Sequence, residues 1–187
     1  MQSADGYAKP QILEKVREAV LKVKSGEAVY ERDSVLFDKP QYPWPLIAIL
    51  LQIASKQSNR LNVIDFGGSL GSTYFQCRSF FSEIKELTWG VVEQEHFVEC
   101  GEKEIADKQL QFYYTVDEAL QENPDSNILL LSGVLQCLPD PYYWLEKFLN
   151  YNFDYIILDR TAFIEQGPDR LTLQHVPSSI YEAVYPS

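Results

Sequence analysis

The sequence predicts a three-layer α/β/α fold, in which helices cover both faces of a doubly wound, mainly parallel sheet. Two observations support this prediction. From residue 59 onward, short apolar runs alternate with helical segments, and this alternation implies right-handed crossovers between parallel strands. The runs 128–131 and 155–158 are apolar at every position, as a central strand buried on both faces requires.

Helical segments are expected before this alternation begins. Apolar residues recur at helical spacing from Pro10 to Lys24, and Gly26 follows as a candidate C-terminal cap. A second helix is expected from Trp44 to Ser55, with a proline in its first turn. Residues 27–42 are polar and show no regular pattern, so we expect an irregular segment between the two helices.

The rest of the chain supplies the five strands and the helices between them. The strands are expected at 61–66, 87–92, 111–115, 128–132 and 155–159, and the helices at 72–82, 95–107, 117–121 and 141–149. We interpret the chain as one compact domain, with residues 1–58 as a helical segment packed on a Rossmann-like core formed by residues 59–187. Such a sheet binds ligands in the crevice at the carboxyl ends of its strands, where the strand order reverses.

The charge balance of the chain excludes some classes of partner. Its 187 residues include 16 Lys and Arg against 27 Asp and Glu, which gives a net charge of −11. Nucleic acids and anionic membrane surfaces are bound through clustered cations, so neither is expected as a partner. The longest apolar stretch, residues 44–51, is too short to cross a bilayer.

The cysteines and the N-terminus indicate the compartment. Cys77, Cys100 and Cys137 are widely spaced and form neither a Cys-x-x-Cys pair nor a zinc-binding pattern. We therefore expect three reduced thiols and no metal. The N-terminus lacks the basic and apolar regions of a signal peptide, so the expected location is cytoplasmic.

A glycine-rich turn, Phe-Gly-Gly-Ser-Leu-Gly-Ser at 66–72, follows the first strand of the core. Glycines let the backbone approach a ligand closely, although tight turns also use glycine for their geometry alone. The phosphate-binding loop pattern is absent, because no lysine follows the last glycine. The dinucleotide pattern Gly-x-Gly-x-x-Gly needs a glycine where the chain has Phe66, which disfavours a nicotinamide-dependent oxidoreductase. Asp65 before the turn suits an amine-bearing ligand better than a pyrophosphate.

An acidic residue also ends the second strand of the core. Glu93 lies 22 residues after Gly71, the spacing at which a carboxylate can accept hydrogen bonds from both hydroxyls of a ribose. A solvated carboxylate at a strand end is the alternative explanation. The combination of this acid with the glycine turn indicates a nucleoside-containing ligand more strongly than either feature does.

The fourth strand ends in Ser132–Pro141, whose sequence is Ser-Gly-Val-Leu-Gln-Cys-Leu-Pro-Asp-Pro. Together with Val63–Gly71 and Glu93, this segment resembles the motifs of class I S-adenosylmethionine-dependent methyltransferases. The segments 31–38, 66–72 and 158–161 are similar to a bacterial group of methyltransferases associated with surface-polysaccharide genes. The chain departs from the family pattern at Ser69, which replaces a glycine, and at Gln136-Cys137, which replace Glu-His.

The resemblance implies S-adenosyl-L-methionine as the cofactor. Asp65 would lie under its amino group, Glu93 would bind the ribose and Gln94 would lie beside the adenine. Asp117 could reach the adenine amine, but it is equally explained as a residue of a helix N-terminus. The implied cofactor-binding residues are Asp65, Gly67, Gly68, Ser69, Gly71, Glu93, Gln94, Asp117, Ser132, Gly133 and Val134.

Methyl transfer to oxygen can require a base, and we name Asp159, Arg160 and His175 as catalytic candidates. Asp159 ends the last strand, Arg160 could bind a carboxylate or phosphate of the acceptor, and His175 has the intrinsic chemistry of a base near neutral pH. Tyr30, Glu31 and Arg32 could form a lid over the site, or else a salt-bridged surface turn.

The expected function is methyl transfer to a small-molecule or glycan-linked acceptor, with oxygen as the target atom. The alternative is a non-catalytic protein of the same fold that serves binding or assembly. The family usually has seven strands, and no apolar strand pattern follows Asp159, so we expect its C-terminal strand hairpin to be missing. The exposed sheet edge could then pair two copies as a homodimer.

Overall fold

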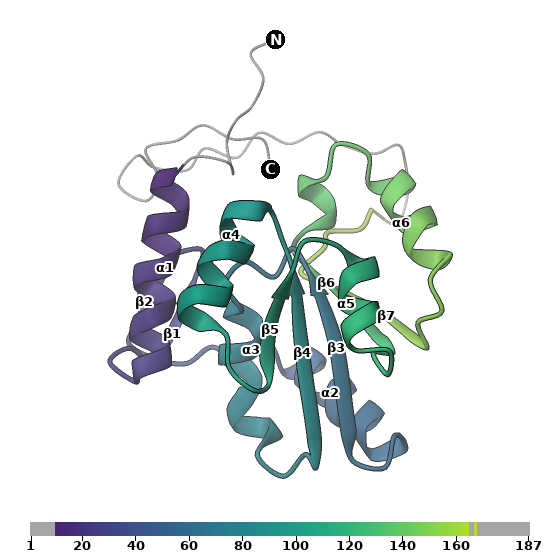
Figure 1. Ribbon diagram of the computed structural model, residues 1–187, viewed down its shortest axis with the longest axis horizontal. Helices are drawn as coiled ribbons and strands as arrows, with labels where there is room; N and C mark the ends of the chain where they lie inside the picture. The colour runs from purple at the N-terminus through teal and green to yellow at the C-terminus, as the bar shows by residue number, and fades with distance from the viewer. Residues whose placement is uncertain (1–9, 165–166, 168–187) are drawn as a thin grey trace.

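A five-stranded parallel sheet forms the centre of the protein, as the computed structural model shows (Figure 1). The structure describes residues 10–164 and 167. The strands are β3 (Arg60–Phe66), β4 (Glu86–Val92), β5 (Leu110–Tyr113), β6 (Ile128–Ser132) and β7 (Tyr155–Asp159). Their order is β5-β4-β3-β6-β7, so the chain reverses direction across the sheet between β3 and β6. The predicted α/β class with a Rossmann-like parallel sheet is confirmed, and strand ends differ from prediction by two residues at most.

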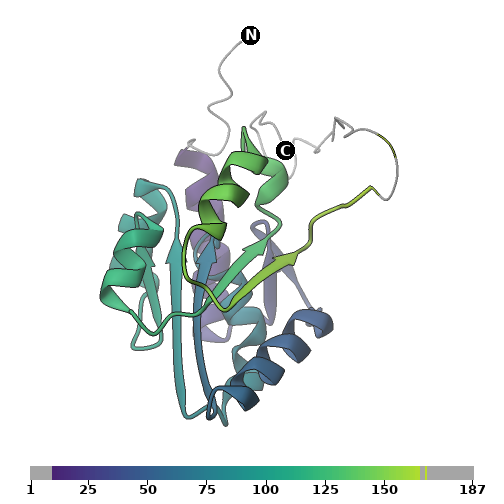
Figure 2. The same ribbon diagram turned by 90° about the vertical axis from the view of Figure 1, so that its right-hand side faces the viewer.

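Helices cover both faces of this sheet. They are α1 (Pro10–Ser25), α2 (Trp44–Lys56), α3 (Ser72–Cys77), α4 (Glu95–Cys100), α5 (Val116–Glu122) and α6 (Pro141–Leu149). One apolar cluster joins side chains of α1, α2 and α3 to one face of the sheet, and a second joins α5 and α6 to the other. Figure 2 shows α2 and α5 on opposite sides of the sheet.

The apolar run of β6 explains why this strand is central. Ile128 and Leu130 pack in the first cluster, whereas Leu129 and Leu131 pack in the second, and all four are 0% exposed. Successive side chains of a strand point to opposite faces, so a strand covered on both sides needs an apolar residue at every position. The interpretation of this run from sequence is therefore confirmed. The same interpretation of the run 155–158 is wrong, because β7 is an edge strand of the described sheet and none of its residues is fully buried.

Residues 27–42 are not irregular, and this prediction is wrong. They contain an antiparallel hairpin of β1 (Tyr30–Arg32) and β2 (Val35–Phe37). The two-residue turn between the strands has positive φ at both positions, 52° and 64°, as a type I′ turn requires. Tyr30 is 4% exposed and stacks on Phe37 at a centroid distance of 5.3 Å. Two three-residue strands are too short to produce a periodic pattern, and packing stabilises them.

Two predicted helices change type before they end. The helix expected at 72–82 ends as α3 at Cys77 and continues as a 3₁₀ turn, Arg78–Phe81. The helix expected at 95–107 ends as α4 at Cys100 and continues as a π turn, Gly101–Ile105. In this turn Gly101 packs on the ring of Phe112, where a Cβ atom would come within 2.6 Å.

Three further expectations concern membrane-spanning helices, the edges of the sheet and the C-terminal hairpin. No helix within residues 10–164 is long and apolar enough to cross a membrane. The edge strands of the central sheet are β5 and β7, and pairing of two copies through an edge stays a prediction. The expected absence of a C-terminal strand hairpin concerns residues that lie outside those described.

Candidate functional site

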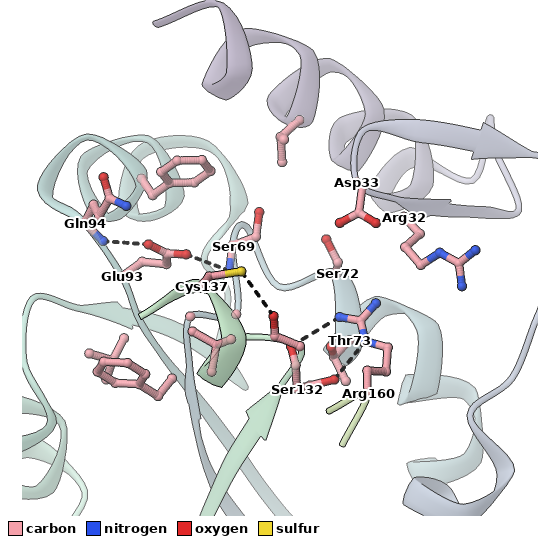
Figure 3. Close-up of a pocket in the computed structure, with 18 of the residues that line it drawn as sticks. Arg32, Asp33, Ser69, Ser72, Thr73, Glu93, Gln94, Ser132, Cys137 and Arg160 are labelled. Atoms are coloured by element: carbon pink, nitrogen blue, oxygen red, sulfur yellow. Dashed lines mark hydrogen bonds between the residues drawn. The ribbon is translucent and has the colours of Figure 1, made fainter. Parts of the chain in front are cut away.

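A cavity of about 390 Å³ lies at the carboxyl ends of β3, β4 and β6, where the strand order reverses (Figure 3). Its walls come from the glycine turn after β3, the residues after β4, the loop after β6 and the turn of the β1–β2 hairpin. This volume falls within the range of small-molecule sites. Open parallel sheets bind their ligands at this position, so we take the cavity as the candidate site.

Glu93 is fixed at the edge of this cavity by the backbone of two neighbouring segments. Its Oε1 accepts a hydrogen bond from the Ser69 amide at 3.3 Å, and its Oε2 accepts one from the Gln94 amide at 2.7 Å. Burial raises the pKa of Glu93, while these two amides and His96 oppose the rise. The sequence spacing pairs Glu93 with the glycine turn, and the Ser69 amide of this turn is hydrogen-bonded directly to Glu93.

The glycines of the turn are explained by packing within the protein. Gly67 has a φ of +74°, and a Cβ atom there would overlap the side chain of Val134. A Cβ atom on Gly68 would lie 2.7 Å from Oδ2 of Asp65. Both positions therefore require glycine without any ligand, which agrees with the geometric explanation of such turns. A ligand is therefore indicated only by the side chains around the cavity and their position.

Asp65 lies behind the turn and does not line the cavity. Its carboxylate packs beneath Gly68, accepts a hydrogen bond from Trp89 Nε1 at 3.1 Å, and is 1% exposed as a residue. Burial raises the pKa of Asp65 to about 7, against the opposing effects of the Trp89 N–H and Arg160. Any effect of Asp65 on a ligand would act through the turn and not by direct contact.

The ends of β6 and β7 carry a polar network that joins two of the catalytic candidates. The Ser132 hydroxyl donates to Asp159 Oδ2 at 2.7 Å and accepts from Arg160 Nε at 3.1 Å. Arg160 Nη2 also donates to the Ser132 carbonyl at 3.3 Å. Arg160 has a φ of +50°, an uncommon conformation for a side-chain-bearing residue that surrounding contacts must maintain. His175, the third candidate, lies outside the described residues.

The remaining predicted residues divide into two groups. Gly133 and Val134 line the cavity, as do Ser69 and Gln94. Gly71 and Asp117 do not line it. A Cβ atom on Gly71 would lie 2.8 Å from the side chain of Leu110. Asp117 lies in the first turn of α5, where its Oδ2 accepts a hydrogen bond from the Tyr151 hydroxyl at 2.9 Å. Asp117 therefore fits its alternative interpretation as a residue of a helix N-terminus, and we correct its assignment to the adenine.

Several lining residues were missed or misjudged from the sequence. Trp144, Thr73 and Cys137 line the cavity although the sequence does not indicate them, and Glu31, assigned from sequence to a lid or a salt-bridged surface turn, lines it as well. Cys137 lies about 3.6 Å from the Gly133 carbonyl oxygen in the loop after β6. The position of Cys137 shortly after a strand end is the sequence signal that could have placed it at the cavity. A cysteine by itself does not indicate a site, because cysteines also serve in packing.

Ser69 occupies a conformation that favours glycine, with a φ of 55°. We predict that Ser69→Gly stabilises the protein by about 0.5 kcal/mol, because release of left-handed strain outweighs the added entropy of glycine in the unfolded chain. Chemical denaturation measures this difference. Ser82→Gly is the matched control, since Ser82 has a helical φ of −57° and should lose stability. A loss of stability in both variants would contradict the prediction.

The fold and the cavity define an α/β protein of Rossmann-like topology with a cavity at its switch point. Comparisons with models of protein families, with curated proteins and with solved structures find no match for the chain. Within residues 10–164, no three side chains of His, Cys, Asp or Glu gather to hold a metal ion. Function is therefore inferred from the geometry of the site.

Proposed function

We propose that the chain is an S-adenosylmethionine-dependent methyltransferase that transfers a methyl group to an oxygen atom of a small-molecule or glycan-linked acceptor. The observation that carries the proposal is the Glu93 carboxylate, held by the Ser69 and Gln94 amides beside the glycine turn. A carboxylate at this position can accept hydrogen bonds from both hydroxyls of a ribose. The sequence segments at 63–71 and 132–141 add the resemblance to methyltransferases.

Phe66 favours a single nucleoside over a dinucleotide. This residue stands where the dinucleotide pattern has its first glycine, and its ring lines the cavity and packs on Phe148 at a centroid distance of 4.9 Å. The first glycine of that pattern permits its tight turn, and the chain has an aromatic residue there instead. A nicotinamide cofactor is therefore disfavoured.

The lining of the cavity fits the parts of the proposed cofactor. Gln94, Phe97 and Tyr114 offer an amide and two rings beside Glu93, which suits an adenine next to its ribose. Gly68 and Ser69 would lie along the amino-acid part. When bound, S-adenosylmethionine supplies an electrophilic methyl group.

Catalysis by the chain then consists largely of holding the acceptor oxygen in line with that group at near-attack distance. In this assignment Gly133 and Val134 line the reaction site. Arg160, which also lines the cavity, would bind an anionic group of the acceptor.

The test is calorimetric titration of the chain with S-adenosylmethionine and S-adenosylhomocysteine, with NAD as the control. We expect micromolar binding of both sulfur compounds and none of NAD. Absence of binding by the folded chain would reject the proposal. Binding without transfer to any acceptor in a broad screen would favour the alternative of a non-catalytic binding protein.

Cys137 provides a second test that needs no acceptor. We predict that S-adenosylhomocysteine, at about ten times its Kd, slows alkylation of Cys137 by iodoacetamide about tenfold, because this thiol lines the cavity. Cys100 lies outside the cavity lining and is the internal control, with an unchanged rate. Cys77 is 0% exposed and burial raises its pKa to about 12, so it should stay unmodified until the protein unfolds. Equal protection of Cys100 would contradict the assignment.

A further inference from the structure

The β1–β2 hairpin closes one side of the cavity and brings a carboxylate to it. Arg32 and Asp33 of the hairpin lie near Ser72 and Arg160, across the cavity from Glu93 and Gln94 (Figure 3). The preceding residue, Glu31, also lines the cavity. An N-terminal segment distant in sequence from the sheet thus forms the wall opposite the expected ribose site.

Glu31 is an almost completely buried acid with an incomplete set of hydrogen bonds. It is 2% exposed, its Oε2 accepts a hydrogen bond from the Ser34 amide at 3.2 Å, and the Ser72 hydroxyl interacts with the same carboxylate. Its Oε1 is buried and has no hydrogen-bond partner among the described residues. A buried carboxylate oxygen without a donor is costly, so this oxygen, on a residue that lines the cavity, indicates a ligand that supplies the donor.

The surroundings of Glu31 suit proton transfer. Burial raises its pKa, and a carboxylate on the same hairpin, Asp33, raises it further. The Ser72 hydroxyl at the start of α3, the Ser34 amide and the cation of Arg160 after β7 act in the opposite direction. A carboxylate whose pKa is raised toward neutrality holds a transferred proton better than an exposed one does.

Space for an acceptor adjoins the first cavity. A second cavity of about 280 Å³ is lined by Tyr30 on the hairpin and shares Arg32, Thr73, Ser132 and Arg160 with the first. Glu31 lines only the first of the two cavities, as expected from the alternation of side chains along β1. A molecule in the second cavity that extends past Arg160 would therefore enter the cavity that Glu31 lines.

We propose that Glu31 is the catalytic base of the methyl transfer and that its Oε1 receives the proton of an acceptor hydroxyl placed from the second cavity. This inference rests on the proposed function and deepens it. The acceptor is thereby assigned as an alcohol, since an orphaned carboxylate oxygen pairs with a hydroxyl that donates to it. Asp159 is less suited to this role, because its Oδ2 already accepts from Ser132.

The step balances in atoms and charge. A lone pair of the acceptor oxygen forms a bond to the methyl carbon, while the electron pair of the carbon–sulfur bond returns to sulfur and cancels its positive charge. The hydroxyl proton passes to Glu31 Oε1 and later to solvent. The products are the methyl ether of the acceptor, S-adenosylhomocysteine and one proton.

The test uses sinefungin, an analogue of S-adenosylhomocysteine that carries an amino group in place of the transferred methyl. Its ammonium would point at the base and pair with Glu31. We expect the wild-type chain to bind sinefungin about tenfold more tightly than S-adenosylhomocysteine, as measured by calorimetry. In Glu31→Gln this preference should disappear, while the affinity for S-adenosylhomocysteine stays within about twofold. The control is Asp38→Asn, an exposed carboxylate after β2, which should keep the preference.

The possible results separate the inference from the proposed function. Failure of the wild-type chain to bind S-adenosylhomocysteine would reject the methyltransferase itself. Binding with an unchanged sinefungin preference in Glu31→Gln would overturn only the role of Glu31, as would an equal loss of affinity for both compounds. A structural role predicts that Glu31→Gln unfolds more easily than the wild type. We expect a melting temperature at least as high, because the variant removes a buried charge, and a lower one would overturn the inference.

Discussion

Replacing Glu93 with alanine is expected to weaken the binding of S-adenosylhomocysteine by at least about 100-fold. Each hydrogen bond to a charged group contributes about 1.5–3 kcal/mol, and the proposed ribose would lose two of them. The carboxylate is fixed by the Ser69 and Gln94 amides before any ligand arrives, so its ordering adds no cost on binding. Calorimetric titration of wild type and variant measures the ratio of the two dissociation constants.

The matched control for this experiment is Glu95→Ala. Glu95 is an exposed acid in the first turn of α4, two residues from Glu93, and it does not line the cavity. Its removal changes the net charge equally but should leave the affinity within about twofold. Circular dichroism must show that both variants are folded. An affinity retained in Glu93→Ala would contradict the ribose assignment, and with it the observation on which the proposed function rests.

The sheet and the position of the cavity could be predicted because the relevant signals are local. The β6 run from Ile128 to Leu131 is apolar without interruption because the strand is covered on both faces. Glu93 could be predicted because strand ends in a parallel sheet meet at one edge, so its spacing from the turn translates directly into proximity. For these features, the order of the strands along the chain is enough to predict which residues lie close together.

The buried position of Glu31 could not be predicted from the sequence. Its burial depends on the packing of a hairpin whose strands have three residues each and whose turn, Asp33-Ser34, contains no glycine. No periodic pattern distinguishes such strands from a polar loop. The orphaned oxygen is a property of the assembled wall, which joins the hairpin to α3 and to the residue after β7. From the sequence, Glu31 is therefore recognised only as part of a segment.

Asp65 is expected to make the stability of the protein fall as the pH rises. Its pKa is about 7 in the folded protein against an ordinary value of 3.8, so the folded state holds its proton more tightly than the unfolded chain does. The stabilising effect of that proton is complete below about pH 4 and is lost as the pH rises through about 7. This pKa shift corresponds to about 4 kcal/mol. Ionised Asp65 therefore lowers the free energy of unfolding considerably at pH 8.

Asp65→Asn should therefore stabilise the protein at pH 8 by about 2 kcal/mol and leave it nearly unchanged at pH 4. The asparagine carbonyl can still accept the Trp89 N–H bond, whereas its amide N–H groups need new acceptors, which reduces the gain. Urea denaturation across this pH range measures the effect. Asp125→Asn, an exposed carboxylate before β6, is the control and should change stability by less than about 0.5 kcal/mol.

The variant Asp65→Asn also tests whether the buried acid beneath the glycine turn contributes to ligand binding. A residue that lowers stability is expected where function requires it. If the Asp65 charge attracts a cofactor ammonium through the turn, Asp65→Asn should bind S-adenosylhomocysteine about tenfold more weakly while it unfolds less readily at pH 8. We expect this combination. A variant of higher stability and unchanged affinity would restrict Asp65 to the packing of Gly68, and a variant of lower stability would contradict the raised pKa itself.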